Sequence, residues 1–509
     1  MARAIVLTGE DLTLAEVWRV AVGGSTATLA ESAKERMRAA RELVDAVRGE
    51  HTYGVNTGFG RFVSAHIPEE LAEELQLRLL RSHACGVGEP YPDEVVRAAM
   101  LLRVNALAKG FSGARVSTAE LLLECMNRDI LPVVPARGSV GASGDLAPLA
   151  HLALPLVGEG QARVNGQLLD GDEALRAVGL APIRLASKEG LSLVNGTQFM
   201  AAMGALGVVR AKRLAATADL ACALSLEALQ GSRTSFRPGV HRARPLKGQQ
   251  ESAANVWRLL DGSAIIESHR WCDKVQDAYA LRCAPQVHGA CRDLLDYVEA
   301  TVSVELNAAT DNPLVLLDED DIVSAGNFHG QPLAFALDAL AIAVAELADI
   351  SERRVERLVN PTLSEGLPPF LVEEGGLNSG FMIPQYVAAA LVSENKVLAH
   401  PASVDSIPTS AGQEDHVSMG NAAGLKALRV LDNVERGLAI ELLAGSQAIE
   451  FLAPLQPGEG VRAVHDVVRT LSPRLLEDRS LSTDIEIVAE AIRSGAVLAA
   501  AESKVGALA

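Results

Sequence analysis

Three segments of the sequence favour helices longer than the usual length of about 8–20 residues. They cover residues 200–230, 333–360 and 422–452, and Ala, Leu and other good helix formers dominate each of them. The second segment ends at Pro361, because a proline disfavours the helical conformation of the residue before it. Long helices of this kind pack into a bundle or form a helical core between subunits. The sequence therefore predicts a mainly α fold.

The first 200 residues differ from the rest of the chain. They mix short helix candidates with turn-rich stretches such as YGVNTGFG at 53–60 and CGVGEPYP at 85–92. A chain of 509 residues is long enough for two or three domains. We therefore expect an N-terminal domain over residues 1–200 that carries the functional loops. Residues 201–509 are expected to form a long-helix bundle that also serves oligomerisation.

Charge and composition exclude several classes of protein. The chain has 46 Lys and Arg against 64 Asp and Glu, a net charge of −18 that disfavours nucleic-acid binding. The most apolar helix candidate, 333–348, contains Asp338 and Glu346, so no membrane span is predicted. The apolar run at the N-terminus is too short for a secretory signal, and the six cysteines form no CxxC pair. We expect a cytoplasmic protein with reduced thiols and, without an HExxH motif or clustered His and Cys, no bound metal.

The segment GSVGASGDLAPLAH at 138–151 is unusual in so helical a chain, because three glycines surround Ala142, Ser143 and Gly144. It is not a nucleophile elbow, since the second residue after Ser143 is Asp145 and not glycine. It is not a phosphate-binding loop either, since no Lys-Ser/Thr pair follows the glycines. Residues this small allow the backbone to approach itself closely.

Such a loop has a chemistry of its own. The Gly144 nitrogen can attack the Ala142 carbonyl carbon, and loss of one water from the new ring and one from the Ser143 side chain leaves a methylidene imidazolone, a strong carbon electrophile. The alternative is a plain glycine-rich loop before a helix that begins near Asp145. The triplet alone favours this alternative, because Ala, Ser and Gly are common residues.

Motifs along almost the whole chain favour the electrophile. Together with the loop they resemble the aromatic amino acid ammonia-lyase family, whose prosthetic group is 4-methylidene-imidazol-5-one (MIO), built from Ala-Ser-Gly. In chain order the motifs are YGVNTGFG, SHACGVGE, LVNGTQ (193–198), QDAYALRCAPQV (276–287), ELNAATDNP (305–313), GNFHGQP (326–332) and QEDHVSMG (413–420). The resemblance implies a helical homotetramer of the fumarase–aspartase-like type, with active sites shared between chains and a ring formed from Ala142, Ser143 and Gly144 without an external cofactor.

Two motifs resemble the histidine-specific branch of that family: Ser82-His83 and Gln413-Glu414-Asp415-His416. An imidazole in an apolar slot would leave its ring nitrogens unpaired, at a cost of about 1–3 kcal/mol each. His83 and Glu414 can pair with those nitrogens. The resemblance thus implies conversion of L-histidine to trans-urocanate and ammonia, the first step of histidine degradation. A tyrosine or phenylalanine ammonia-lyase, an aminomutase with the same ring, and an inactive helical assembly remain alternatives.

The resemblance also assigns roles to individual side chains. Tyr53 is the expected base for the β-proton, with Glu414 as the alternative, and the Arg282 guanidinium is suited to bind the substrate carboxylate. We expect Asp145 to cap the helix that follows the loop. The predicted catalytic residues are Tyr53, Ala142, Ser143, Gly144, Tyr279 and Glu414. The predicted substrate-binding residues are His83, Asn195, Gln276, Arg282 and Phe328.

Overall fold

The computed structural model of the chain describes residues 4–47 and 52–509. It is mainly α, as the sequence predicts, and it divides into two compact units. The loop unit comprises Met1–Val209, Val298–Asp338 and Pro401–Leu425. The bundle unit comprises Arg210–Tyr297, Ala339–His400 and Lys426–Ala509. Each unit draws on three segments of the chain, and the division at residue 200 stays a prediction.

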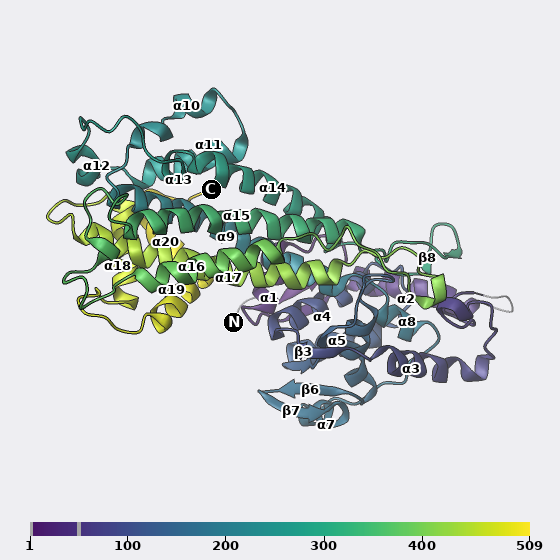
Figure 1. Cartoon of the computed structure of the whole chain (residues 1–509). Helices are drawn as coiled ribbons and strands as arrows, with labels where there is room; N and C mark the ends of the chain where they lie inside the picture. The colour runs from purple at the N-terminus through teal and green to yellow at the C-terminus, as the bar shows by residue number, and fades with distance from the viewer. Residues whose placement is uncertain (1–3, 48–51) are drawn as a thin grey trace. The chain divides into compact units, whose positions relative to one another are not determined.

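The three predicted long helices are present (Figure 1). They are α9 (Gln198–Ala228), α15 (Gln331–Val359) and α17 (Gly420–Glu450), each within two residues of the predicted ends. Helix α15 ends just before Asn360-Pro361, as the proline requires. The helical periods seen in the sequence therefore correspond to real elements.

The loop unit surrounds one almost fully buried helix, α4 (Asp93–Ala108), in which every residue from Ala98 to Ala108 is buried. A helix that is apolar on all sides belongs in the centre of a core. Its other helices are α1 (Leu14–Ala21), α2 (Glu31–Ala46), α3 (Ala72–His83), α5 (Val116–Asn127), α6 (Leu146–Ala153), α7 (Gly171–Ala177) and α8 (Glu189–Val194).

In the described part of the loop unit, short strands form four small sheets. Strands β1 (Ile5–Leu7) and β2 (Ala27–Leu29) are parallel, whereas β3 (Val87–Pro90) and β5 (Pro135–Arg137) are antiparallel. Antiparallel pairing also joins β4 (Ile130–Pro132), β6 (Gln161–Val164) and β7 (Gln167–Asp170), and it joins β8 (Leu314–Leu316) to β9 (Asp321–Val323). The segment between β5 and α6 is the Ala-Ser-Gly loop, so a strand and a helix fix its two ends.

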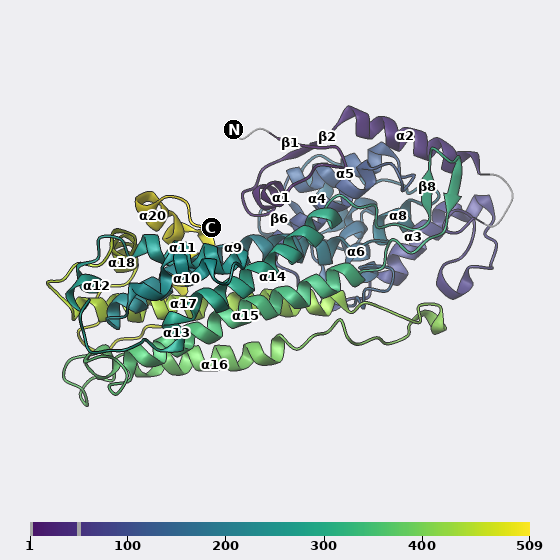
Figure 2. The ribbon, with the colours of Figure 1, turned by 90° about the horizontal axis from the view of Figure 1, so that it is seen from above.

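The bundle unit consists of helices. Helix α16 (Met382–Leu398) and the parts of α15 and α17 that belong to this unit lie side by side in both views (Figures 1 and 2). Its other helices are α10 (Pro238–Arg242), α11 (Lys247–Leu259), α12 (Ala264–Ser268), α13 (Tyr279–Arg282), α14 (Ala284–Glu305), α18 (Glu459–Leu471), α19 (Ser482–Ser494) and α20 (Ala496–Val505). A fully buried ion pair joins Arg354 of α15 to Glu441 of α17, with Nε and Oε1 2.5 Å apart. Buried charges persist in a core only when they are paired in this way.

Single turns of 3-10 helix occupy several of the connections. They are η1 (Gly60–Phe62), η2 (Glu69–Leu71), η3 (Leu154–Val157), η4 (Arg233–Phe236), η5 (Pro369–Leu371) and η6 (Ser410–Gly412). Among the helices of the described residues, none combines the length and the apolar character needed to cross a membrane.

Candidate active site

The Ala-Ser-Gly loop depends on two glycines. Gly141 and Gly144 have φ values of +69° and +74°, a backbone region that side chains other than glycine rarely adopt. A Cβ on Gly144 would collide with the Gly196 carbonyl, and a Cβ on Gly141 would collide with the Ser418 hydroxyl. The close approach of these segments therefore requires glycine at both positions.

Gly144 pairs with Gly196 in an isolated β-bridge, whose two backbone hydrogen bonds hold the residues on either side of Gly144. The Gly196 N–H donates to the Ser143 carbonyl at 3.3 Å, and the Asp145 N–H donates to the Gly196 carbonyl at 2.6 Å. The Ser139 hydroxyl adds a hydrogen bond to the Gly144 carbonyl at 3.3 Å. These bonds restrain the peptide groups on both sides of the Gly144 nitrogen, which is the atom that ring closure requires. The small residues and the restrained backbone both fit the formation of an imidazolone from this triplet.

Asp145 occupies the N-cap position of α6, as predicted, but the predicted capping bond is absent. Its carboxylate instead accepts a hydrogen bond from the Met200 N–H at 3.0 Å and another from the Ser139 hydroxyl at 3.1 Å. The carboxylate therefore bonds to the Met200 amide in the first turn of α9 and not to an amide in the first turn of α6. Burial raises the pKa of the Asp145 carboxyl to about 7. The residue thus ties the loop to α9.

The Glu414 carboxylate contacts the side chain of Ser143 in the loop. The Ser143 hydroxyl donates to its Oε1 at 3.3 Å, and the Thr409 hydroxyl donates to its Oε2 at 2.6 Å. The Glu414 charge also acts on Tyr53 and His83. The structure therefore gathers four predicted site residues, Ser143, Glu414, Tyr53 and His83, in the loop unit.

The surroundings of Tyr53 favour the neutral phenol. Burial raises the pKa of Tyr53, the negative Glu414 raises it further, and the Gly60 N–H, 3.4 Å from the phenol oxygen, opposes both. To remove a proton as a base, Tyr53 would have to be ionised to the phenolate. Both the burial of Tyr53 and the Glu414 charge therefore oppose formation of the phenolate.

His83 is held in one orientation at the end of α3. Its Nδ1 lies 3.0 Å from both the Leu79 carbonyl oxygen and the Ser82 hydroxyl oxygen. Because a carbonyl oxygen only accepts, the neutral tautomer that pairs with it has the proton on Nδ1 and an acceptor at Nε2. Burial lowers the pKa of His83, with the Leu79 carbonyl and the Glu414 charge opposing that effect. A neutral imidazole with a free acceptor nitrogen suits a ligand that carries an N–H group.

Two further predicted residues belong to the loop unit. The Asn195 side chain is buried, and its Nδ2 donates to the Asn312 carbonyl at 3.0 Å while its Oδ1 lacks a protein partner. Phe328 lies half-buried in the turn between β9 and α15. The unpaired Asn195 oxygen is a buried acceptor of the kind that a ligand satisfies.

The other three predicted residues belong to the bundle unit. Gln276 and Tyr279 are exposed, and Tyr279 retains 71% of its accessible surface. The Arg282 guanidinium carbon lies 4.8 Å from the centre of the Tyr279 ring, and its Nε is buried without a protein partner. This pair stacks on one turn of α13, a geometry that leaves hydrogen-bonding groups of the arginine available for a ligand.

Several residues near the loop escaped prediction. Thr409 bonds to Glu414, whereas Arg103, Lys188 and Asp311 form a buried polar group around Asn195. The sequence signal for Arg103 is a single arginine within the apolar run MLLRVNALA of α4. Thr409 has no comparable signal, because its role depends on a contact formed only in the folded chain.

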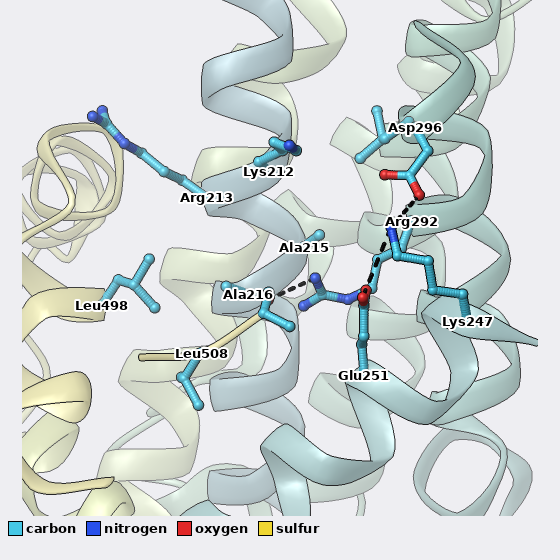
Figure 3. A pocket seen from close by; sticks show the side chains of 12 residues that line it. Lys212, Arg213, Ala215, Ala216, Lys247, Glu251, Arg292, Asp296, Leu498 and Leu508 are labelled. Atoms are coloured by element: carbon cyan, nitrogen blue, oxygen red, sulfur yellow. Dashed lines mark hydrogen bonds and ion pairs between the residues drawn. The ribbon is translucent and has the colours of Figure 1, made fainter. Parts of the chain in front are cut away.

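The bundle unit also contains a cavity (Figure 3). Its volume is about 360 Å³, and none of the predicted site residues lines it. Lys247 stands between two carboxylates there, 2.6 Å from Asp296 and 3.9 Å from Glu251. Over residues 4–47 and 52–509, no group of three or more His, Cys, Asp or Glu side chains is arranged to hold a metal ion.

Comparison with known proteins agrees with this geometry. The family described as aromatic amino acid lyase matches residues 12–470. The chain belongs to the aromatic amino acid lyase family. Its fold is the one expected of this family, and the family resemblance of its sequence motifs is confirmed.

Relatives of this aromatic amino acid lyase are similar along their whole lengths. The histidine ammonia-lyase of Gloeobacter violaceus is 56% identical over 506 residues, covering 99% of this chain and 98% of that protein. The histidine ammonia-lyase of Caldanaerobacter subterraneus is 53% identical, with 97% of each chain covered.

Solved structures of the family superpose closely on the chain. The histidine ammonia-lyase from Trypanosoma cruzi has a TM-score of 0.92 and 48% identity, with 99% of this chain and 96% of that chain covered. A tyrosine aminomutase from Streptomyces globisporus has a TM-score of 0.94 and 38% identity, with 99% of each chain covered. The fold is thus common to enzymes with different substrates, and specificity depends on the site.

Proposed function

We propose that this aromatic amino acid lyase eliminates ammonia from L-histidine to give trans-urocanate, the first step of histidine degradation. The observation that carries the proposal is the hydrogen bond between Ser143 and Glu414, whose charge in turn acts on His83. The relatives named histidine ammonia-lyase, at up to 56% identity, support the same substrate. The chain is therefore a carbon–nitrogen lyase.

The prosthetic group in this proposal is MIO formed from Ala142, Ser143 and Gly144. The left-handed Gly144 and the hydrogen bonds on Ser143 and Asp145 support ring closure at this triplet. Once formed, the ring supplies a carbon electrophile that conjugates with the substrate and so assists departure of a poor leaving group. The group needs no external cofactor and no metal.

His83 and Glu414 are the residues proposed to bind the substrate imidazole. His83 Nε2 can accept the N–H of one ring nitrogen, since its Nδ1 is engaged with the Leu79 carbonyl. The Glu414 carboxylate can accept a hydrogen bond from the N–H of the other ring nitrogen when that nitrogen is protonated. A phenyl ring would leave both protein groups unpaired at a cost of about 1–3 kcal/mol each, which favours histidine over phenylalanine.

Tyr53 is the proposed base that removes the β-proton, with Glu414 as the alternative. The Glu414 charge raises the cost of ionising Tyr53. A base placed in this way contributes about 10²–10⁴-fold to the rate. The pH dependence of variants at the two positions separates their contributions.

Arg282 is proposed to bind the substrate carboxylate through its free guanidinium nitrogens, with Tyr279 stacked against it. Asn195 and Gln276 are the proposed amide donors and acceptors of the site, and Phe328 is proposed to flank the ring. Tyr279 is proposed as a catalytic residue that acts on the amino group. These groups orient the substrate so that the β-carbon faces the base.

The proposed assembly is a homotetramer in which several chains build each active site. Helix α16 supports self-association, because Ile383, Tyr386 and Val397 are large apolar side chains that it leaves exposed. We place the enzyme in the cytoplasm, without nucleic-acid or membrane partners, in keeping with its acidic charge.

Turnover of three amino acids tests the substrate. With purified protein we expect urocanate from L-histidine, and at least tens of times lower kcat/KM with L-tyrosine and L-phenylalanine. Absence of urocanate would contradict the proposal. Because tyrosine aminomutase shares the fold, the same reactions are also analysed for β-amino acids. A β-amino acid as the main product would establish an aminomutase instead.

A further inference from the structure

Arg103 is a buried cation with few hydrogen bonds in the core of the loop unit. It lies on the buried helix α4 and has no accessible surface. Its Nη1 donates to the Asn195 carbonyl oxygen at 2.7 Å, while Nε and Nη2 lack protein partners. Burial lowers the pKa of the guanidinium to about 10, with the Asp311 charge opposing. A buried arginine so poorly paired is costly to the fold, and its single strong contact indicates where it acts.

That contact leads directly to the Ala-Ser-Gly loop. The Asn195 carbonyl and the Gly196 N–H belong to one peptide group, and this N–H donates to the Ser143 carbonyl at 3.3 Å. The Gly196 carbonyl accepts the Asp145 N–H at 2.6 Å. A Cβ on Gly196 would lie 2.8 Å from Arg103 Nη1, so the guanidinium packs against this peptide. Arg103 is thus linked to Ser143 through two hydrogen bonds and one peptide group.

We propose that Arg103 is a positioning residue for formation of the MIO ring, acting through the Asn195–Gly196 peptide on the Ser143 carbonyl. The proposal rests on the function proposed above. A cation on the Asn195 carbonyl polarises the peptide and makes the Gly196 N–H a stronger donor. The neighbouring Lys188–Asp311 pair, with Nζ and Oδ2 3.2 Å apart, holds the other side of Asn195, because Asp311 Oδ1 lies 3.4 Å from its Nδ2.

Polarisation of the Ser143 carbonyl assists a defined step. In ring closure the Gly144 nitrogen bonds to the Ala142 carbonyl carbon, and the Ala142 oxygen leaves as water with the amide hydrogens of Ser143 and Gly144. The Ser143 hydroxyl then leaves as a second water with the Ser143 Cα hydrogen. No oxidant is needed. A polarised Ser143 carbonyl acidifies that Cα hydrogen, and the clamp on both sides of Gly144 keeps its nitrogen in place.

The test follows ring formation by mass, independently of turnover. Wild-type protein, Arg103→Met and Arg103→Lys are made in a cell-free pulse, and the peptide containing 138–151 is weighed at successive times. Loss of one hydrogen bond to a charged group should slow the loss of the two waters by about 10- to 100-fold in Arg103→Met. Arg103→Lys, which keeps a cation and a donor, should recover part of the rate. Ring formation in Arg103→Met at the wild-type rate, or faster than in Arg103→Lys, would overturn the proposal.

Arg354→Met is the matched control, because Arg354 is an equally buried arginine in the bundle unit. Arg354→Met should lower the stability of the protein to denaturant and leave the rate of ring formation as in the wild type. If Arg354→Met and Arg103→Met slow ring formation equally, the effect is general destabilisation and the proposal is overturned. If Arg103→Met does not fold, Arg103→Lys is compared with Arg103→Gln, and equal rates would overturn it. A wild-type peptide that loses no water would instead refute the function proposed above.

Discussion

The Ser143 hydroxyl donates a hydrogen bond to the Glu414 carboxylate at 3.3 Å, joining residues 271 positions apart in the sequence. This contact places the serine of a self-modifying loop beside a carboxylate suited to an imidazole ring. Thr409 holds the other carboxylate oxygen, so Glu414 is oriented from both sides. The proposed chemistry and the proposed specificity thus meet at one pair of residues.

Ser143→Ala removes the hydroxyl that must leave to form the electrophile. We expect a folded protein whose turnover of histidine falls by several orders of magnitude. Without the electrophile, nothing assists the departure of the amine, which is a poor leaving group. Steady-state kinetics and circular dichroism test this. Ser503→Ala, an exposed serine in α20, is the control and should keep wild-type kinetics. Turnover within a few fold of wild type in Ser143→Ala would contradict the assignment.

Glu414→Gln retains the shape of the side chain and removes its charge. We expect kcat to fall by about 10²–10⁴-fold if the carboxylate takes part in proton removal. Its loss also relieves the repulsion that raises the pKa of Tyr53, so the alkaline part of the pH–rate profile should shift to lower pH. Asp415→Asn is the neighbouring carboxylate control. An unshifted profile in Glu414→Gln would show that Tyr53 is not the base coupled to it.

His83→Leu tests the specificity of the site. Without its acceptor nitrogen, the kcat/KM for histidine should fall by about 5- to 150-fold, equivalent to about 1–3 kcal/mol. The ratio of phenylalanine to histidine turnover should rise, because an apolar wall suits a phenyl ring. The exposed His400→Leu serves as control. A variant with an unchanged ratio would remove His83 from the binding site.

Asp145→Asn should change how stability depends on pH. The pKa of Asp145 is raised from 3.8 to about 7 by burial, so the folded protein binds a proton more tightly than the unfolded chain. That contribution to the free energy of unfolding is full below pH 3.8 and declines as pH rises towards 7. Denaturant unfolding at several pH values should show a flatter slope over this window in the variant.

The buried Glu227 has a pKa raised in the same way, also to about 7. Glu227→Gln should therefore flatten the slope of stability against pH as well, while leaving the loop unaltered. A slope in Asp145→Asn as steep as that of the wild type would contradict the assignment of a raised pKa to Asp145.

The long helices could be predicted from the sequence because helix propensity and the stop at Pro361 are local properties. The loop glycines were predictable for the same reason, since φ preferences belong to the residue itself. Asp145 takes the predicted N-cap position without the capping hydrogen bond, because the Met200 amide of another helix competes for the carboxylate. Arg103 was missed because its partner, the Asn195 carbonyl, lies 92 residues away.

The mass of the wild-type peptide spanning residues 138–151 tests the central claim most directly. If Ala142, Ser143 and Gly144 form the electrophile, the peptide from active protein is lighter than its sequence by two waters. A peptide of full unmodified mass, obtained from protein that still releases urocanate, would contradict the account.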